Sequence, residues 1–525
     1  MTLRRQAGPN RFAQVKDRMR ARRRRRSAPS FLRTPAGSLI SDSVPLHSTI
    51  LQPGRNCWQL ARAQRVAALV DAGPYFRRLE QAFYVAKRSI MIIGWDFDAS
   101  IPLSPDRDDC ASLGDYLRNL VEQESELEVK VLVWSLSVVH APSAPLPALL
   151  GAAWQEHPRI RVELDTHHPL YAAHHQKIVV VDDTLAFVGG IDLTVERWDS
   201  TRHAANDPVR RCADGSIYPG VHDIQMAVDG DAAKAIADLA RERWHDATGE
   251  VLPPIDNTES RWPEDLAAEF KDIYVGISRT RPAWDGHPGV HEVAALTVDA
   301  LKAARQSIYI EAQYLAAAFV GDLLEESLSR PQGPEIVIVV TRASRSPIEQ
   351  WVMGNNRDRL LRRLKRADRF DRLRVFYPVV PDGEKDCDVL IHSKLIIVDD
   401  SFLRVGSANL NNRSMGLDTE CDLAIEAASV DHRRAIANLR ERLLAEHLGV
   451  PEEVAAPVFA ATPSFIAAIE RLNHHERGLR PFDKLDKRGP IRPVIGTWLL
   501  DPSRPFGPLW FHRRTRSKPL PTDLP

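Results

Sequence analysis

A pattern of residues that occurs twice with identical spacing constrains the fold of this chain more than any other feature. The pattern is H-x-K-x4-D-x6-G-[GS]-x-[DN], and its two copies occupy residues 175–192 and 392–409. A unit repeated in this detail predicts two halves that are built on the same plan. The length of 525 residues agrees, because a single hydrophobic core rarely grows beyond about 250–300 residues.

Each copy of the pattern predicts a strand, a turn and a returning strand. Residues 178–181 and 395–398 are apolar and mostly β-branched, which predicts a buried strand after each lysine. A pair of aspartates follows each of these strands and predicts a turn, and the next apolar run predicts the returning strand. We expect the glycines that come after it to let the backbone approach a ligand closely.

The histidine and the lysine of each copy are suited to a phosphate group. His175 and Lys177 are two residues apart, as are His392 and Lys394, so each pair projects from one face of its strand. A lysine supplies positive charge for phosphate oxygens, and an imidazole can attack phosphorus or transfer a proton. One such pair could be structural, but two pairs with the same spacing favour a site that acts on phosphate.

The doubled motif resembles the HKD motif of the phospholipase D superfamily, and the resemblance extends over residues 55–475. It implies an α/β fold of two pseudo-symmetric α/β/α halves, each a mixed β-sheet flanked by helices, with the active site at their interface. We expect four segments: a basic, disordered N-terminal tail (1–50), the first half (51–255), the second half (256–475) and a Pro-rich, irregular C-terminal tail (476–525).

Two further segments resemble the phospholipases D that hydrolyse phosphatidylcholine. Residues 189–199 contain GGxDL followed by RWD, and residues 221–230 resemble that subfamily's HD-containing strand. Residues 307–314 resemble the family's strand that ends in ExQY. The resemblance implies hydrolysis of glycerophospholipids to phosphatidate and a free head group. Head-group exchange is implied when an alcohol replaces water.

The resemblance also implies how the motif residues divide the reaction. His175 would attack phosphorus and form a phosphohistidine, and His392 would protonate the leaving alcohol and then activate water. The chemistry alone allows the reverse assignment. Lys177 and Lys394 would bind the non-bridging phosphate oxygens, and two further groups would support them: Asn409 as a donor, and Asp192 as a positioning group, because its charge would repel phosphate.

Four acids complete the set of site residues. Asp223 and Glu420 match the family acids that hydrogen-bond the two imidazoles, where a carboxylate fixes the tautomer and favours the imidazolium. Asp182 and Asp399 complete the two motifs and are counted with the catalytic residues, although their place after a strand favours a structural role in the turn. We expect neither metal ligands nor a cofactor.

The composition limits the partners of the chain. A formal net charge of zero predicts no nucleic-acid partner, and five cysteines without CxxC spacing argue against a disulfide framework and a cysteine zinc site. No apolar run is long enough to predict a membrane span. We therefore expect a monomer, cytoplasmic or peripheral to a membrane, that meets phospholipid at the bilayer surface, with export by a non-classical route left open.

Two arginine-rich segments have two interpretations each. Residues 1–33 hold eleven arginines and lack the apolar region of a secretory signal, so they are either a tether to anionic head groups or a solvated tail without a specific role. Residues 357–372 hold seven arginines, which predicts a solvated helix face in preference to a lipid or phosphate surface.

Three other functions remain as alternatives. Residues 409–414 also resemble cardiolipin-synthase-type phosphatidyltransferases, although those enzymes usually carry N-terminal membrane spans. A nuclease ranks lower because of the neutral net charge. A lipid-binding scaffold without catalysis ranks last, because both motifs are complete.

Overall fold

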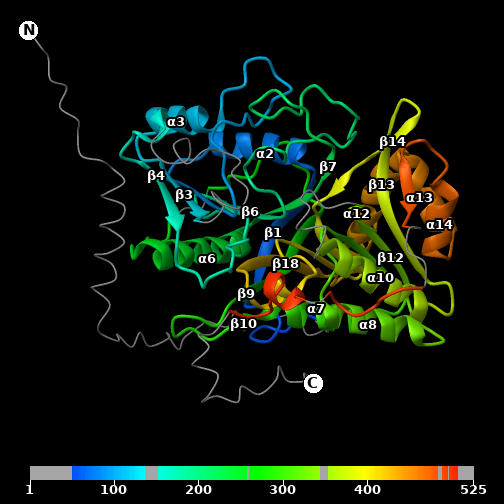
Figure 1. The fold of residues 1–525 in the computed structure, drawn as a ribbon. Coiled ribbons are helices and arrows are strands. Elements are labelled where there is room, and N and C mark those ends of the chain that lie inside the picture. Colours follow the sequence, from blue (N-terminus) through cyan, green and yellow to red (C-terminus); the bar gives the residue numbers. More distant parts are fainter. Residues whose placement is uncertain are drawn as a thin grey trace, which may run out of the picture. The chain divides into compact units, whose positions relative to one another are not determined.

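The computed structural model describes residues 50–135, 152–256, 259–342, 353–482, 488–494 and 496–505. These residues belong to one compact unit, His47–Pro525, whose ribbon is drawn in Figure 1. The arginine-rich residues 1–33 lie outside the described residues, so both interpretations of that segment stay predictions. Within the described part of the chain, no helix is both long enough and apolar enough to cross a bilayer.

Seven strands of the first half pair in the order β4-β3-β2-β5-β6-β8-β1. The pairs among β4, β3 and β2 are parallel, and the remaining pairs are antiparallel. The predicted strands of the first motif are β5 and β6. The bounds are β1 Gln59–Val70, β2 Ser89–Gly94, β3 Glu128–Trp134, β4 Ile160–Asp165, β5 Ile178–Val181, β6 Leu185–Gly189 and β8 Ile224–Asp229.

The second half repeats this order as β13-β12-β11-β16-β17-β18-β9, with the same change from parallel to antiparallel pairing. Strand β1 pairs with β9, so the two halves join along equivalent strands. The predicted mixed α/β fold is confirmed. The bounds are β9 Phe270–Arg281, β11 Ser307–Ala312, β12 Glu335–Val340, β13 Leu373–Asp382, β16 Lys394–Val398, β17 Phe402–Gly406 and β18 Glu420–Glu426.

Helices cover the outer faces of both sets of strands and also contribute to the centre. Helices α2 and α3 pack on the outer face of the first half (Figure 1), and α7, α8 and α10 pack on the outer face of the second. Helices α6 and α12 contribute to the core that the halves share. The bounds are α2 Ala72–Tyr84, α3 Leu113–Gln123, α6 Gly230–Thr248, α7 Glu292–Ala303, α8 Ala318–Ser329, α10 Asn355–Ala367 and α12 Val430–Leu448, with α13 Glu452–Ala461 and α14 Phe465–Leu472 after them.

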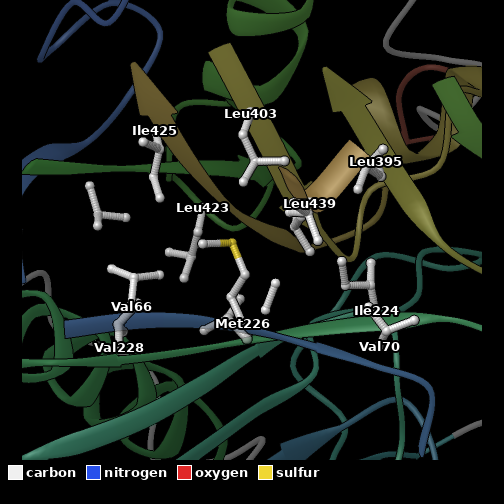
Figure 2. Close-up of a cluster of buried hydrophobic side chains, with 14 of the residues drawn as sticks. Val66, Val70, Ile224, Met226, Val228, Leu395, Leu403, Leu423, Ile425 and Leu439 are labelled. Atoms are coloured by element: carbon white, nitrogen blue, oxygen red, sulfur yellow. The ribbon is translucent and has the colours of Figure 1, made fainter. Parts of the chain in front are cut away.

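A shared apolar core holds the two halves together. Figure 2 shows Ile224, Met226 and Val228 of β8 facing side chains of β16, β17, β18 and α12. These three residues alternate along β8, while Ala227 between them contacts the outer core of the first half, as expected for a strand. Since each large apolar side chain contributes roughly 1.5–3 kcal/mol on burial, this core stabilises the contact between the halves.

The structure differs from the prediction in the C-terminal tail and in the arginine-rich segment. The tail is not irregular throughout: β19 (Gly478–Pro481) pairs with β13, and Thr497–Leu500 form the short helix α15. The arginines of α10 do not form only a solvated face. Arg359, Arg362 and Arg366 donate to backbone carbonyls of residues 489–492, so they hold the tail against the second half.

Candidate active site

Two short backbone contacts between the halves bring the motifs together. Strand β7 (Val221–His222) pairs with β15 (Leu390–Ile391), and the amide of His392 donates to the carbonyl of His222 at 2.8 Å. In the same way the amide of His175 donates to the carbonyl of Thr419 at 2.9 Å. Each motif histidine is therefore fixed to the residue that precedes the acid of the other half.

The acids and imidazoles consequently pair across the halves. Nδ1 of His175 lies 3.0 Å from Oε2 of Glu420, and Nδ1 of His392 lies 2.6 Å from Oδ2 of Asp223. These are the contacts that the resemblance implied for the two acids. Because each Nδ1 lies against a carboxyl group, Nε2 is the ring nitrogen that would act on a substrate.

One pocket receives both motifs. Its volume is about 1500 Å³, and His175, His392, Asp192 and Asn409 line it. Much of the wall is aromatic or apolar, and the residues of this kind include Phe76, Trp95, Ile101, Trp134, Tyr171, Trp198, Tyr218, Tyr314, Met353, Leu499 and Leu500. The pocket thus combines aromatic and apolar side chains with charged and polar ones.

The two lysines lie next to the imidazoles and are almost completely buried. Nζ of Lys177 lies 3.0 Å from Oδ2 of Asp192 and donates to the carbonyl of His175. Nζ of Lys394 donates to the carbonyl of His392 and to Oε1 of Gln313 at 3.1 Å. Asp192 therefore neutralises Lys177, in keeping with the predicted positioning role. Gln313 holds the lysine of the second motif.

Burial determines the charge of the His175–Glu420 pair. It lowers the pKa of His175 well below its usual range, and the nearby Lys177 and Lys394 lower it further. Burial also raises the pKa of Glu420 to about 8. In the pair as it stands, burial therefore opposes the imidazolium that a neighbouring carboxylate would favour. A neutral imidazole is the form that can act as a nucleophile.

Burial acts on the second motif as well. It lowers the pKa of Lys394 to about 7, and Asp223 opposes this shift. It raises the pKa of Asp223, and here Lys394 opposes the shift. A negatively charged phosphate beside Lys394 would raise this pKa again, because its charge would favour the protonated lysine.

Asp182 and Asp399 do not belong with the catalytic residues. Both follow the end of their strand that lies away from the histidines, and both have positive φ, at 50° and 52°. Asp182 accepts the amides of residues 87–89, and Asp399 accepts the amides of residues 305–307. The two aspartates therefore fix the turn and the start of β2 and β11. Their inclusion among the catalytic residues is corrected: they are structural turn acids.

The glycines of the motifs allow close packing within the protein. A Cβ atom on Gly190 would lie 2.1 Å from Oδ1 of Asp223, and one on Gly406 would lie 2.0 Å from Oδ1 of Asp422. Such distances leave no room for a side chain. Gly190 is therefore required by the acid that pairs with His392.

Several residues that contribute to the site were not predicted. The hydroxyl of Ser407, inside the second motif, donates to Oε2 of Glu420 at 2.6 Å. Leu499 and Leu500 of the tail line the pocket, and Asp501 after them accepts the amide of Arg413 at 2.9 Å. Ser407 could have been noticed as the counterpart of Gly190, but no local pattern connects the tail with residues about ninety positions earlier in the chain.

Comparisons with known proteins agree with this geometry. Residues 82–273 match the family described as Phospholipase D, and residues 297–442 match the family described as Cardiolipin synthase, PLD-like domain. The chain belongs to the phospholipase D superfamily. Each half thus matches a family of this superfamily over the region that holds its motif.

Two curated relatives extend the comparison. Phospholipase D1 of Saccharomyces cerevisiae is 23% identical over 488 residues, which cover 73% of this chain and 28% of that protein. Phospholipase D A of Dictyostelium discoideum is 24% identical over 472 residues, which cover 75% of this chain and 36% of that protein. The chain therefore spans about a third of the length of these curated relatives.

The fold has a counterpart among solved structures. The crystal structure of phosphatidylserine synthase from Haemophilus influenzae superimposes with a TM-score of 0.51 and 15% identity, over 75% of this chain and 89% of that chain. At this identity the likeness is one of fold alone.

Proposed function

We propose that this chain is a phosphodiesterase of the phospholipase D type that hydrolyses glycerophospholipids, with phosphatidylcholine as the leading substrate. The observation that carries the proposal is the placement of His175 and His392 on one pocket, each with Nδ1 against a carboxyl group of the other half. Two such imidazoles supply both a nucleophile and an acid. Phosphodiester cleavage needs both groups.

In the first step, Nε2 of neutral His175 attacks phosphorus. The P–N bond forms, the bond from phosphorus to the head-group oxygen breaks, and His392 gives its proton to that oxygen. Lys177, Lys394 and the amide of Asn409 stabilise the charge that develops on the non-bridging oxygens. The burial of both lysines strengthens this effect, because water screens the charges less.

In the second step, His392 accepts a proton from water and the resulting hydroxide attacks phosphorus. The P–N bond breaks, phosphatidate leaves and His175 returns to its neutral form. If an alcohol enters in place of water, the same step gives an exchanged head group. Hydrolysis and transphosphatidylation therefore share the phosphohistidine and differ only in the acceptor.

The pocket wall supports a lipid substrate over a nucleic acid. Its aromatic and apolar side chains can contact the glycerol and acyl part of a phospholipid. Five carboxylates and three arginines also line the pocket. Asp192 and Asp418 pair with Lys177 and Arg413. A polyanionic strand would meet repulsion from the other three carboxylates, which are Asp98, Glu196 and Asp214.

A phosphatidyltransferase is the second candidate, because residues 297–442 match a family described as Cardiolipin synthase. The two candidates differ in the acceptor and can be separated with one set of vesicles. Phosphatidylcholine vesicles, with and without ethanol, are expected to yield choline with phosphatidate or phosphatidylethanol. Diphosphatidylglycerol formed from phosphatidylglycerol vesicles, without choline release from phosphatidylcholine, would favour the transferase.

A further inference from the structure

A second cluster of buried titratable groups lies beside the active site and has no role in the steps above. Asp71, His203, His222 and Glu446 each point one ligand-type atom into a common centre, and these atoms all lie within 4.8 Å of one another. Oε1 of Glu446 lies 2.9 Å from Nε2 of His203 and 2.9 Å from Nδ1 of His222. The carboxylate of Asp71 lies 3.4 Å and 3.1 Å from the same two nitrogens.

The outer nitrogen of each histidine is held by another carboxylate. Nδ1 of His203 lies 2.8 Å from Oδ2 of Asp199, and Nε2 of His222 lies 3.0 Å from Oε2 of Glu311. A carboxylate in this position takes the ring N–H and leaves a lone pair on the inner nitrogen. Histidines that bind metals are fixed by outer carboxylates in this way.

The centre of the cluster therefore requires two positive charges. Two lone pairs and two carboxylates face one another there, and they would repel without a cation between them. Two protons, one on each imidazole, would meet this need. A divalent cation would meet it equally well and would balance the same charge.

Asp71 distinguishes between these two possibilities. Its Oδ2 is buried and accepts no hydrogen bond, so the protonated network leaves an oxygen unsatisfied that a cation would satisfy. Asp71 also precedes helix α2 as its N-cap residue, yet its side chain does not cap the helix, and its backbone has φ 64° and ψ 157°. Glycine is nearly the only residue that adopts this conformation readily, so the fold directs this carboxylate into the cluster at a cost.

We propose that Asp71, His203, His222 and Glu446 bind one divalent transition-metal ion of the zinc class. Two imidazole nitrogens and two carboxylate oxygens are a suitable four-coordinate set for zinc. At a ligand distance of about 2.0–2.1 Å, the edges of a tetrahedral site are about 3.3 Å long. The four nitrogen–oxygen contacts above, from 2.9 to 3.4 Å, are near this length, with Asp71 presenting Oδ2 to His203 and Oδ1 to His222.

The proposed ion would be structural and would join the two halves. Asp71, His203 and His222 belong to the first half, and Glu446 belongs to α12 of the second. His222 directly precedes Asp223, and Glu311 behind it accepts the hydroxyl of Ser393, which lies next to His392. The ion would thus fix the backbone on both sides of the Asp223–His392 pair without contacting the substrate. The sequence predicted no metal site, because the four ligands come from separate segments without a metal-binding spacing.

The first test measures the metal content of the purified full-length chain by elemental mass spectrometry, after expression in zinc-containing medium. We expect one zinc ion per chain in the wild type and about tenfold less in the double variant Asp71→Asn, Glu446→Gln. His174→Gln is the control. His174 is a buried histidine that lies 3.3 Å from Asp165 outside the cluster, so this variant should keep the metal.

A second measurement needs only the wild type, in case the double variant does not fold. The chain is unfolded in denaturant with a chelator, refolded without metal and titrated with Co²⁺ or Zn²⁺. The visible absorption of tetrahedral Co²⁺ and a higher thermal midpoint with Zn²⁺ would support the site. Wild-type protein without stoichiometric metal, and without either response on titration, would overturn it and leave two protons at the centre. Neither readout depends on lipid turnover.

Discussion

Oδ2 of Asp223 lies 2.6 Å from Nδ1 of His392, although 169 positions separate the two residues in the chain. His175 and Glu420 form the reciprocal pair at 3.0 Å. Neither half contains a complete pair of acid and imidazole, because each half supplies the histidine of one pair and the acid of the other. The site therefore exists only when the halves are packed together.

Replacement of Asp223 tests the role of this pairing. Asp223→Asn keeps the size of the side chain but removes the charge that orients His392, so we expect kcat to fall about 10²–10⁴-fold with KM little changed. Steady-state turnover of phosphatidylcholine vesicles measures both constants. Asp229→Asn is a matched control, because Asp229 is a buried acid at the end of β8, the strand that begins directly after Asp223, and it pairs with Arg65. A variant Asp223→Asn with at least half the wild-type kcat would refute the role.

Gly190→Ala tests the same acid from its other side. The new Cβ would lie 2.1 Å from Oδ1 of Asp223, so the carboxylate must move away from His392. We expect a loss of stability of about 1–3 kcal/mol together with a loss of kcat of about tenfold or more.

Gly406→Ala provides the comparison for this variant. Its Cβ would displace Asp422, which pairs with Arg404 and not with an imidazole. Stability should fall to a similar extent, and kcat per folded molecule should fall less than in Gly190→Ala. Equal losses of kcat in the two variants would contradict the account.

The periodicity and spacing of the sequence predicted the strands of the two motifs and the turn aspartates. The resemblance added the pairing of Asp223 and Glu420 with the imidazoles, which the structure places at hydrogen-bond distance. Strand β1 was not predicted, because Gln59–Val70 mixes arginines with alanines and owes its conformation to pairing with β8 and β9. The tail and the buried cluster at His222 depend on contacts between distant segments, which leave no local pattern.

The raised pKa of Glu420 predicts how stability depends on pH. Burial raises this pKa from 4.5 to about 8, so between these values the folded chain keeps a proton that the unfolded chain releases. The stabilisation is fully present below pH 4.5 and is lost as the pH rises through about 8. Glu420→Gln has no such proton. We expect the free energy of unfolding in urea to fall less between about pH 5 and pH 8 in this variant than in the wild type, and equal slopes would contradict the shift.

Asp501 tests whether the tail shapes the pocket. Its carboxylate accepts the amides of Asn412 and Arg413 at 3.2 and 2.9 Å, and Leu499 and Leu500 before it line the pocket. Asp501→Ala should release this wall, so we expect KM for phosphatidylcholine vesicles to rise about threefold to tenfold with a smaller change in kcat. An unchanged KM would show that the tail does not contribute to substrate binding.

The most direct test of the central claim is turnover of phosphatidylcholine vesicles by the wild type, His175→Asn and His392→Asn, with choline and phosphatidate both measured. His245→Asn, an exposed histidine of α6, serves as the control. The account predicts equal release of both products by the wild type and the control, and a loss of about 10³-fold or more in each active-site variant. Wild-type turnover by either active-site variant would contradict the claim that the two imidazoles share one reaction.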